Sequence, residues 1–156
     1  MWDSLFGIAN IWALVCWAAL ILLPRGPFVQ SAIFYAGIGL LCLAYAVLLV
    51  LLLIGTLDSA AVEGEGAGNF QTIEGVRGIF MSDGGVTVGW IHYLALDLFA
   101  GLWIAKDADQ KEFSRLVQAP VLLLTFVAGP AGLLLWLAVR EGRARRAARR
   151  SQGVGT

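Results

Sequence analysis

Charged side chains are scarce in this chain of 156 residues. Asp, Glu, Lys and Arg together occupy 14% of its positions, whereas a soluble domain is charged at about a quarter of its positions. Hydrophobic residues make up 59% of the chain, and the mean hydropathy is +0.79. A soluble fold would need more polar surface than this composition provides, so the sequence predicts a membrane protein. Its expected partner is membrane lipid.

Cysteine and histidine are rarer still. The two cysteines, Cys16 and Cys42, both lie in apolar stretches, where they are expected to pack as small residues rather than form a disulfide. The one histidine, His92, argues against a haem or di-iron centre with histidine ligands. No nucleophile elbow and no phosphate loop is found in the sequence. We therefore expect no metal and no cofactor.

Four apolar blocks dominate the chain. A helix that crosses the hydrocarbon needs roughly 20 mainly apolar residues, and each block is long enough and apolar all round. The sequence predicts an all-α, polytopic membrane protein with four transmembrane helices in a single domain over residues 1–140. The expected helices are residues 4–23, 28–55, 86–105 and 116–139, each bound being approximate.

The first two blocks are joined by the short segment Pro24-Arg25-Gly26-Pro27, which predicts a tight helical hairpin. The first block has no basic residue before it and no small-residue cleavage site after it, so we expect a retained helix rather than a signal peptide. In the second block, Gly37 and Gly39 offer a face for close packing against a neighbouring helix.

Arginines near the end of the chain predict its orientation. Residues 141–156 form a basic tail that is expected to be disordered and to stay in the cytoplasm, because short Lys- and Arg-rich segments are retained there. Four crossings would place both termini on the cytoplasmic side, with seven basic residues inside and four outside. The tail can also contact anionic headgroups. It has no motif or interleaved aromatic residues for nucleic acid, so we expect no nucleic-acid partner.

The segment 58–85 is the main polar stretch between the blocks. Its first part, Glu63–Gly68, is expected to be a flexible loop. Its second part has apolar residues at helical spacing and Asn69 placed as an N-cap. The pattern predicts a short helix lying in the membrane interface. The apolar residues are Phe70, Ile73, Val76 and Phe80.

The fourth block contains Pro120 and then Gly129-Pro130-Ala131-Gly132. Pro130 cannot donate to the carbonyl of Phe126, so the helix is expected to bend there. A freed carbonyl at membrane depth needs another partner or a wet or ligand-filled cavity. A binding site and a structural kink are both consistent with this pattern.

One carboxyl lies in the middle of the third block. Asp97 is expected close to the membrane midplane, where an ionised carboxyl costs about 2.5–3.5 kcal/mol, so it should face the bundle interior. Tyr93 is one turn away and could hydrogen-bond it, whereas His92 is too far round the helix to pair with it directly. Interhelical hydrogen bonding is the structural alternative, at about 0.6 kcal/mol per bond.

A set of residues around these three and further along the chain follows a known pattern: Gly89–Phe99, Gly101, Trp103, Ile104, Asp107, Ala119, Pro120, Leu124–Phe126 and Gly129–Leu134. The pattern resembles the neoxanthin-synthase family, small membrane proteins named for an abscisic-acid-deficient plant mutant. The resemblance implies an isomerase that converts a carotenoid epoxide into an allene, with one acid and one base. It implies His92 and Asp97 in those roles, with Tyr93 in support. The expected substrate-binding residues are Trp90, Phe99, Trp103, Thr125, Gly129 and Pro130.

Several functions remain in competition. The first is an enzyme in carotenoid biosynthesis, in the cytoplasmic (inner) membrane of a bacterium, as the Ala-, Gly- and Arg-rich composition suggests. The second is a carotenoid- or lipid-binding protein without catalysis. The third is a proton relay or transporter, which the intramembrane Asp97 and the Gly-Pro break in the fourth helix suggest. A structural membrane scaffold is a further alternative.

Overall fold

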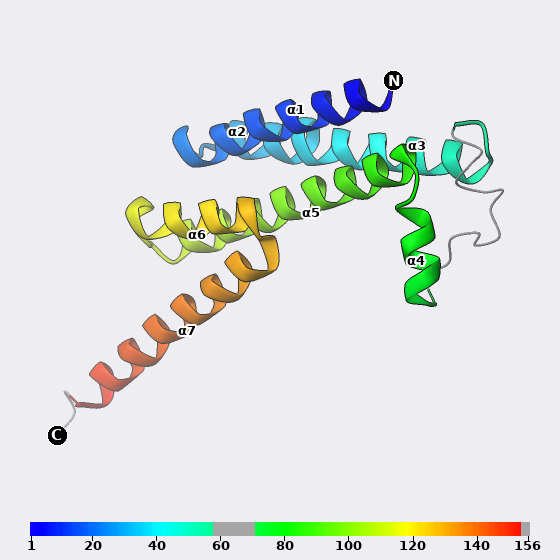
Figure 1. The fold of residues 1–156 in the computed structure, drawn as a ribbon. Helices are drawn as coiled ribbons and strands as arrows, with labels where there is room; N and C mark the ends of the chain where they lie inside the picture. Colours follow the sequence, from blue (N-terminus) through cyan, green and yellow to red (C-terminus); the bar gives the residue numbers. More distant parts are fainter. Residues whose placement is uncertain (58–70, 154–156) are drawn as a thin grey trace. The chain divides into compact units, whose positions relative to one another are not determined.

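A computed structural model describes the backbone of residues 1–57 and 71–153 and the side chains as far as residue 143. Every regular element in these ranges is a helix, which confirms the predicted all-α class (Figure 1). The chain divides into two compact units, Met1–Leu98 and Phe99–Thr156. The elements are α1 (Trp2–Leu22), α2 (Pro27–Ala32), the π-helix η1 (Ile33–Gly39), α3 (Leu40–Leu53), α4 (Ile73–Ile79), α5 (Asp83–Gln110), α6 (Arg115–Val127) and α7 (Gly129–Gly153).

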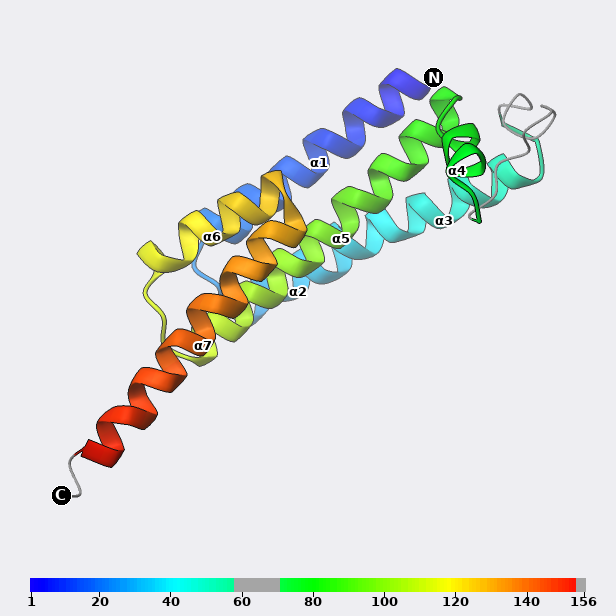
Figure 2. The ribbon, with the colours of Figure 1, turned by 60° about the horizontal axis from the view of Figure 1, so that its bottom comes forward.

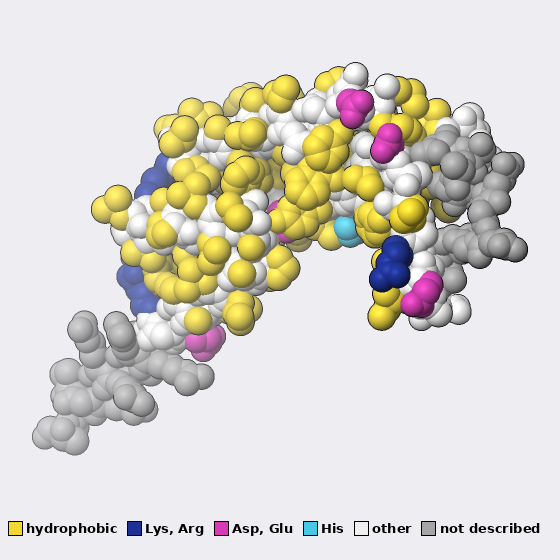
Figure 3. Space-filling model, viewed as in Figure 1, with side chains coloured by type: hydrophobic (Ala, Val, Ile, Leu, Met, Phe, Trp, Pro, Cys, Tyr) yellow, Lys and Arg dark blue, Asp and Glu magenta, His cyan; other side chains and the backbone are white. Residues whose placement is uncertain are grey.

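Three helices are long and apolar enough to cross a membrane. They are α1, the continuous helix Pro27–Leu53 and α5, whereas α6 is apolar but has only 13 residues. Large hydrophobic side chains are exposed along these helices, and Figure 3 shows hydrophobic side chains over much of the face that it draws. Such surfaces are stable against lipid, and the chain is a membrane protein.

The hairpin predicted at residues 24–27 joins α1 to α2. Pro27 is the first residue of α2, where its missing N–H costs no hydrogen bond. The Arg25 Nε donates to the carbonyl of Leu20 at 3.0 Å, and Gln30 Nε2 donates to the carbonyl of Arg25 at 3.1 Å. These side chains satisfy backbone groups that the turn leaves open.

Gly37 allows α1 and η1 to pack closely. A Cβ at this position would lie 2.9 Å from the Cys16 Sγ, so the predicted close-packing role holds for Gly37. Gly39 is exposed, and a Cβ there would meet only the chain's own Phe34 carbonyl. The indole of Trp12 donates to the carbonyl of Ala36 at 3.0 Å, which ties α1 to the π-helical stretch.

The short helix predicted in the middle segment is α4. Its N-cap is Thr72, whose hydroxyl accepts from the Gly75 N–H at 3.0 Å. The predicted cap Asn69, together with Phe70 and the loop Glu63–Gly68, lies outside the described residues. A threonine is a favourable N-cap because its oxygen satisfies one of the first free N–H groups of the helix.

The sequence predicted one helix over residues 116–139, but the structure has two helices in this apolar block. α6 ends at Val127, and Ala128 leaves the helical region with φ −150° and ψ 79°. Pro130 then lies in the first turn of α7, the position where a proline is tolerated. The proline thus separates two helices instead of bending one.

Within unit 2, α6 and α7 form a hairpin around this break (Figures 1 and 2). A Cβ on Gly132 would overlap the backbone and the hydroxyl of Thr125. The Thr125 hydroxyl donates to the carbonyl of Val121 at 2.8 Å and is fully buried. Glycine and threonine therefore let the two helices meet at backbone distance.

Candidate functional site

His92 lines an apolar cavity of 230 Å³ in unit 1. The ring of Tyr45 from α3 lies against it, with centroids 5.1 Å apart and a tilt of 48°. These are the polar groups of a lining that is otherwise hydrophobic. The other lining residues are Leu49, Leu52, Ile79, Phe80, Gly85, Val88 and Gly89.

Two glycines of α5 shape this cavity. Gly85, Gly89 and His92 fall on one stripe of the helix, at offsets of four and three residues. A Cβ at Gly85 would overlap the carbonyl of Ile79, and a Cβ at Gly89 would overlap the ring of Phe80. The end of α4 and the turn that follows it can therefore lie directly on α5 and close one side of the cavity.

Trp90 and Tyr93 lie on another face of α5 and do not line this cavity. Their rings stack with centroids 5.1 Å apart, and Trp90 also stacks on Phe6 of α1 at 5.7 Å. The Trp90 Nε1 donates to the Asn10 Oδ1 at 2.9 Å. The contacts of Trp90 hold α1 against α5, and Tyr93 stacks on this interface residue from within α5.

Asp97 is 8% exposed and lies five residues beyond His92 in α5. Its burial agrees with the prediction that an intramembrane carboxyl faces the interior of the protein. It is not among the described residues that line the His92 cavity. The structure therefore places one of the two predicted acid–base groups at a cavity and buries the other one in the helix packing.

In unit 2, Phe99 and Trp103 of α5 line a groove of 360 Å³ together with Ala100 and two leucines of α7, Leu133 and Leu137. Phe99 is 48% exposed and Trp103 is 37% exposed. This groove has no titratable side chain among its described lining residues. It can hold an apolar chain but supplies no proton donor or acceptor.

The remaining predicted binding residues, Thr125, Gly129 and Pro130, all lie at the junction of α6 and α7. Thr125 and Gly129 are buried there, whereas Pro130 is exposed. Because the Thr125 hydroxyl already donates within its own helix, the described contacts of these residues are those of a helix junction.

Tyr45, Asn10 and Asp107 were not among the predicted site residues, although Asp107 belongs to the stretch that carries the family resemblance. Asp107 accepts a hydrogen bond from the Trp136 Nε1 at 3.0 Å, pairs with Lys111 and lies 3.6 Å from the Arg140 Nε. A polar residue such as Asn10 in an otherwise apolar helix was a usable indication of an interhelical hydrogen bond. The partners of Tyr45 and Asp107 become evident only from the helix packing.

Residues 4–136 match the family model described as ABA DEFICIENT 4-like. The chain belongs to this family, which confirms the family predicted from the stretch around His92. No curated protein and no solved structure matches the chain.

Proposed function

We propose that this member of the ABA DEFICIENT 4-like family binds a carotenoid epoxide, or a similar long apolar lipid with a polar end, and isomerises it without a cofactor. The observation that carries the proposal is the His92 imidazole opening into an apolar cavity beside Tyr45. Family membership supports the substrate class. An ionisable side chain in an apolar pocket is the usual arrangement for proton transfer to a bound ligand.

The proposed reaction has no net redox change. An acid protonates the epoxide oxygen as its C–O bond breaks, and a base removes a vinylic proton, which leaves an allene and a hydroxyl group. The imidazole of His92 can perform either proton transfer, because one ring nitrogen carries a proton while the other accepts one. Asp97 is proposed to perform the other proton transfer, with Tyr93 in support, so that the proton taken up by the base replaces the one given by the acid.

The volume of the cavity limits what it can hold. Pockets for whole drug-sized ligands occupy about 300–1,000 Å³, and this one has 230 Å³. A ring-shaped end group fits this volume better than a complete carotenoid does. We propose that the end group enters the cavity while the long polyene lies along lipid-exposed helix surface.

The groove of unit 2 is proposed as an apolar binding surface in its own right, formed around Phe99 and Trp103. Trp90, Thr125, Gly129 and Pro130 are proposed to support ligand binding through the helix contacts that they make. Since the groove has no proton donor or acceptor among its described residues, it favours the second candidate function, which is carotenoid or lipid binding without catalysis.

We propose that the protein resides in the cytoplasmic membrane of a bacterium, with its basic tail in the cytoplasm. α4 is proposed to lie in the interface, since Ile73, Val76 and Phe80 are exposed apolar residues on it or directly after it. The number of crossings then decides where Met1 lies. Four crossings would put both termini in the cytoplasm, and three would separate them.

Pigment analysis of a host that makes carotenoid epoxides tests the proposal. The host would express the unaltered protein, His92→Ala, Asp97→Asn or the control Tyr35→Phe, which changes an exposed residue outside the cavity. We expect a new isomer of unchanged mass with the unaltered protein and the control, and a large loss of it with His92→Ala. An unchanged pigment that purifies with the protein would instead support binding without catalysis. An unaltered pigment profile with no bound pigment would refute both functions.

A further inference from the structure

The end of α5 and the middle of α7 come together in unit 2. The carboxylate of Asp107, near the end of α5, accepts from the Trp136 indole at 3.0 Å and lies 3.6 Å from the Arg140 Nε. Asp107 therefore lies beside the point in α7 where the apolar residues end and the basic residues begin, at Arg140.

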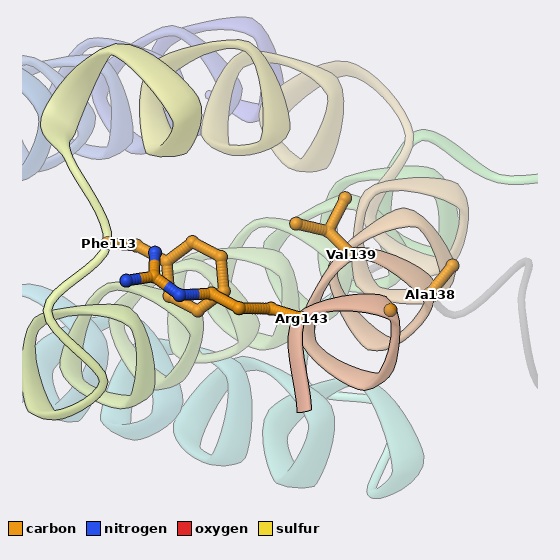
Figure 4. A pocket seen from close by; sticks show the side chains of 5 residues that line it. Phe113, Ala138, Val139 and Arg143 are labelled. Atoms are coloured by element: carbon orange, nitrogen blue, oxygen red, sulfur yellow. The ribbon is translucent and has the colours of Figure 1, made fainter. Parts of the chain in front are cut away.

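The segment between α5 and α6 joins the same cluster. The ring of Phe113 meets the Trp136 ring edge-on at 5.0 Å, and the guanidinium of Arg143 lies 4.4 Å from the Phe113 ring centre (Figure 4). The side-chain amide of Gln118, in the first turn of α6, donates to the Phe113 carbonyl at 2.7 Å and to Asp109 at 3.0 Å. Thus α6 begins where the apolar part of α7 ends.

Neither helix of the hairpin has an apolar stretch long enough to cross the hydrocarbon. α6 has 13 residues, which at about 1.5 Å each give about 20 Å. The apolar part of α7, before Arg140, is about 16 Å long by the same rise, against a hydrocarbon thickness of about 30 Å. A crossing would need the two segments to run on in one direction, but the chain leaves the helix at Ala128 and α7 packs back on α6.

We propose that α6 and α7 form a re-entrant hairpin that enters and leaves the membrane on the same face. The polar cluster around Asp107 lies at the headgroups, and the junction of Thr125 and Gly132 lies in the hydrocarbon. The exposed apolar side chains of the hairpin then contact the acyl chains of a single leaflet. They are Leu116, Val117, Leu123, Leu124, Val127, Leu134, Leu135 and Leu137.

The distribution of basic residues supports this hairpin and identifies the leaflet. The chain has 11 Lys and Arg residues. With three crossings, Arg77 lies on one side of the membrane and all the others lie on the opposite side. Four crossings would divide the same residues seven to four. Because cytoplasmic loops carry the excess of Lys and Arg, the stronger bias favours three crossings, a hairpin in the cytoplasmic leaflet and Met1 on the opposite side. The proposed topology differs from the expectation of four crossings with both termini in the cytoplasm.

Labelling of single cysteines with a membrane-impermeant maleimide in spheroplasts tests the hairpin. The variants are Ser4→Cys, Ser114→Cys and Glu141→Cys, all at exposed positions. Both native cysteines lie within candidate spans, so the protein without an added cysteine serves as the control. We expect Ser4→Cys to react from outside, and Ser114→Cys and Glu141→Cys to react only after lysis.

Two results would overturn the proposal. Reaction of Ser114→Cys from outside while Glu141→Cys stays protected would mean that the fourth block crosses the membrane. Reaction of both from outside would refute the assignment to the cytoplasmic leaflet. A C-terminal fluorescent-protein fusion and an N-terminal alkaline phosphatase fusion, both active, would support the same topology without a cysteine in the hairpin.

Discussion

The indole of Trp90 donates a hydrogen bond at 2.9 Å to the side chain of Asn10, a residue 80 positions earlier in the chain. The Asn10 amide also donates to the carbonyl of Phe6 at 2.7 Å, so its orientation is fixed within α1. Both polar groups belong to helices that are apolar enough to cross the membrane. The pair therefore specifies how α5 lies against α1 in unit 1.

Replacing Asn10 by leucine should weaken this helix pair modestly. Interhelical hydrogen bonds in membranes contribute about 0.6 kcal/mol on average, and the stacking of Phe6 on Trp90 remains. We expect a larger loss for Trp90→Ala, because it removes the hydrogen bond together with two aromatic contacts. Thermal denaturation in detergent would measure both changes. Equal losses for the two variants would contradict the contribution assigned to the rings.

Gly132→Ala should disrupt the junction of α6 and α7. The added methyl group would overlap the backbone of Thr125, and overpacking of this kind costs about 1–3 kcal/mol. Gly142→Ala, in the same helix, is the matched control, since a Cβ there meets no atom within 4 Å. Alanine favours a helix over glycine by about 1 kcal/mol, so the control should be unchanged or more stable. A comparable loss for both variants would refute the close approach at Gly132.

Gly89→Ala should reduce the space beside His92. Its methyl group would push the Phe80 ring toward the cavity or out of contact with α5. We expect less bound or converted pigment at nearly unchanged protein stability, because a side chain can move more easily than a backbone. Gly7→Ala, where a Cβ meets nothing within 4 Å, is the control. Full activity of Gly89→Ala would place the ligand elsewhere.

Tyr45→Ala should lower the rate of pigment conversion more than Tyr45→Phe does. The ring of Tyr45 lies against His92, and an aromatic contact is worth about 0.5–1.5 kcal/mol, which corresponds to a loss of about tenfold or less. The phenylalanine variant keeps the ring and should keep most of the activity. Tyr35→Ala, on an exposed site of η1, is the control. A greater loss for Tyr45→Phe would instead assign a role to the hydroxyl.

The sequence predicts the three long helices well because each is marked by composition over its full length. Pro27 also marks the start of the second one, and the acidic and glycine-rich segment separates it from α5. The reversal at Ala128 was not predictable in the same way. An apolar block of the same length results whether its helix crosses the membrane or turns back, and only contacts such as Asp107 with Trp136 distinguish the two.

The candidate site was predictable only in part. An imidazole in an apolar helix identified His92, and burial of Asp97 followed from the cost of a carboxyl in lipid. Helical spacing gave the separate faces of His92 and Asp97, but not the residues of other helices that lie beside them. Tyr45 comes from another helix, and the cavity depends on the contact of Phe80 with Gly89, which no periodicity in a single helix describes.

The most direct test uses the purified protein in liposomes with an epoxide carotenoid and no other protein or cofactor. Chromatography would follow the pigment over time for the unaltered protein and for His92→Gln, which keeps a polar side chain but cannot exchange a proton near neutral pH. We expect a product of unchanged mass with the unaltered protein, and a rate lower by about a hundredfold or more with His92→Gln, as for loss of a general acid or base. Equal rates for the two proteins, or bound pigment that the unaltered protein never converts, would contradict catalysis at His92.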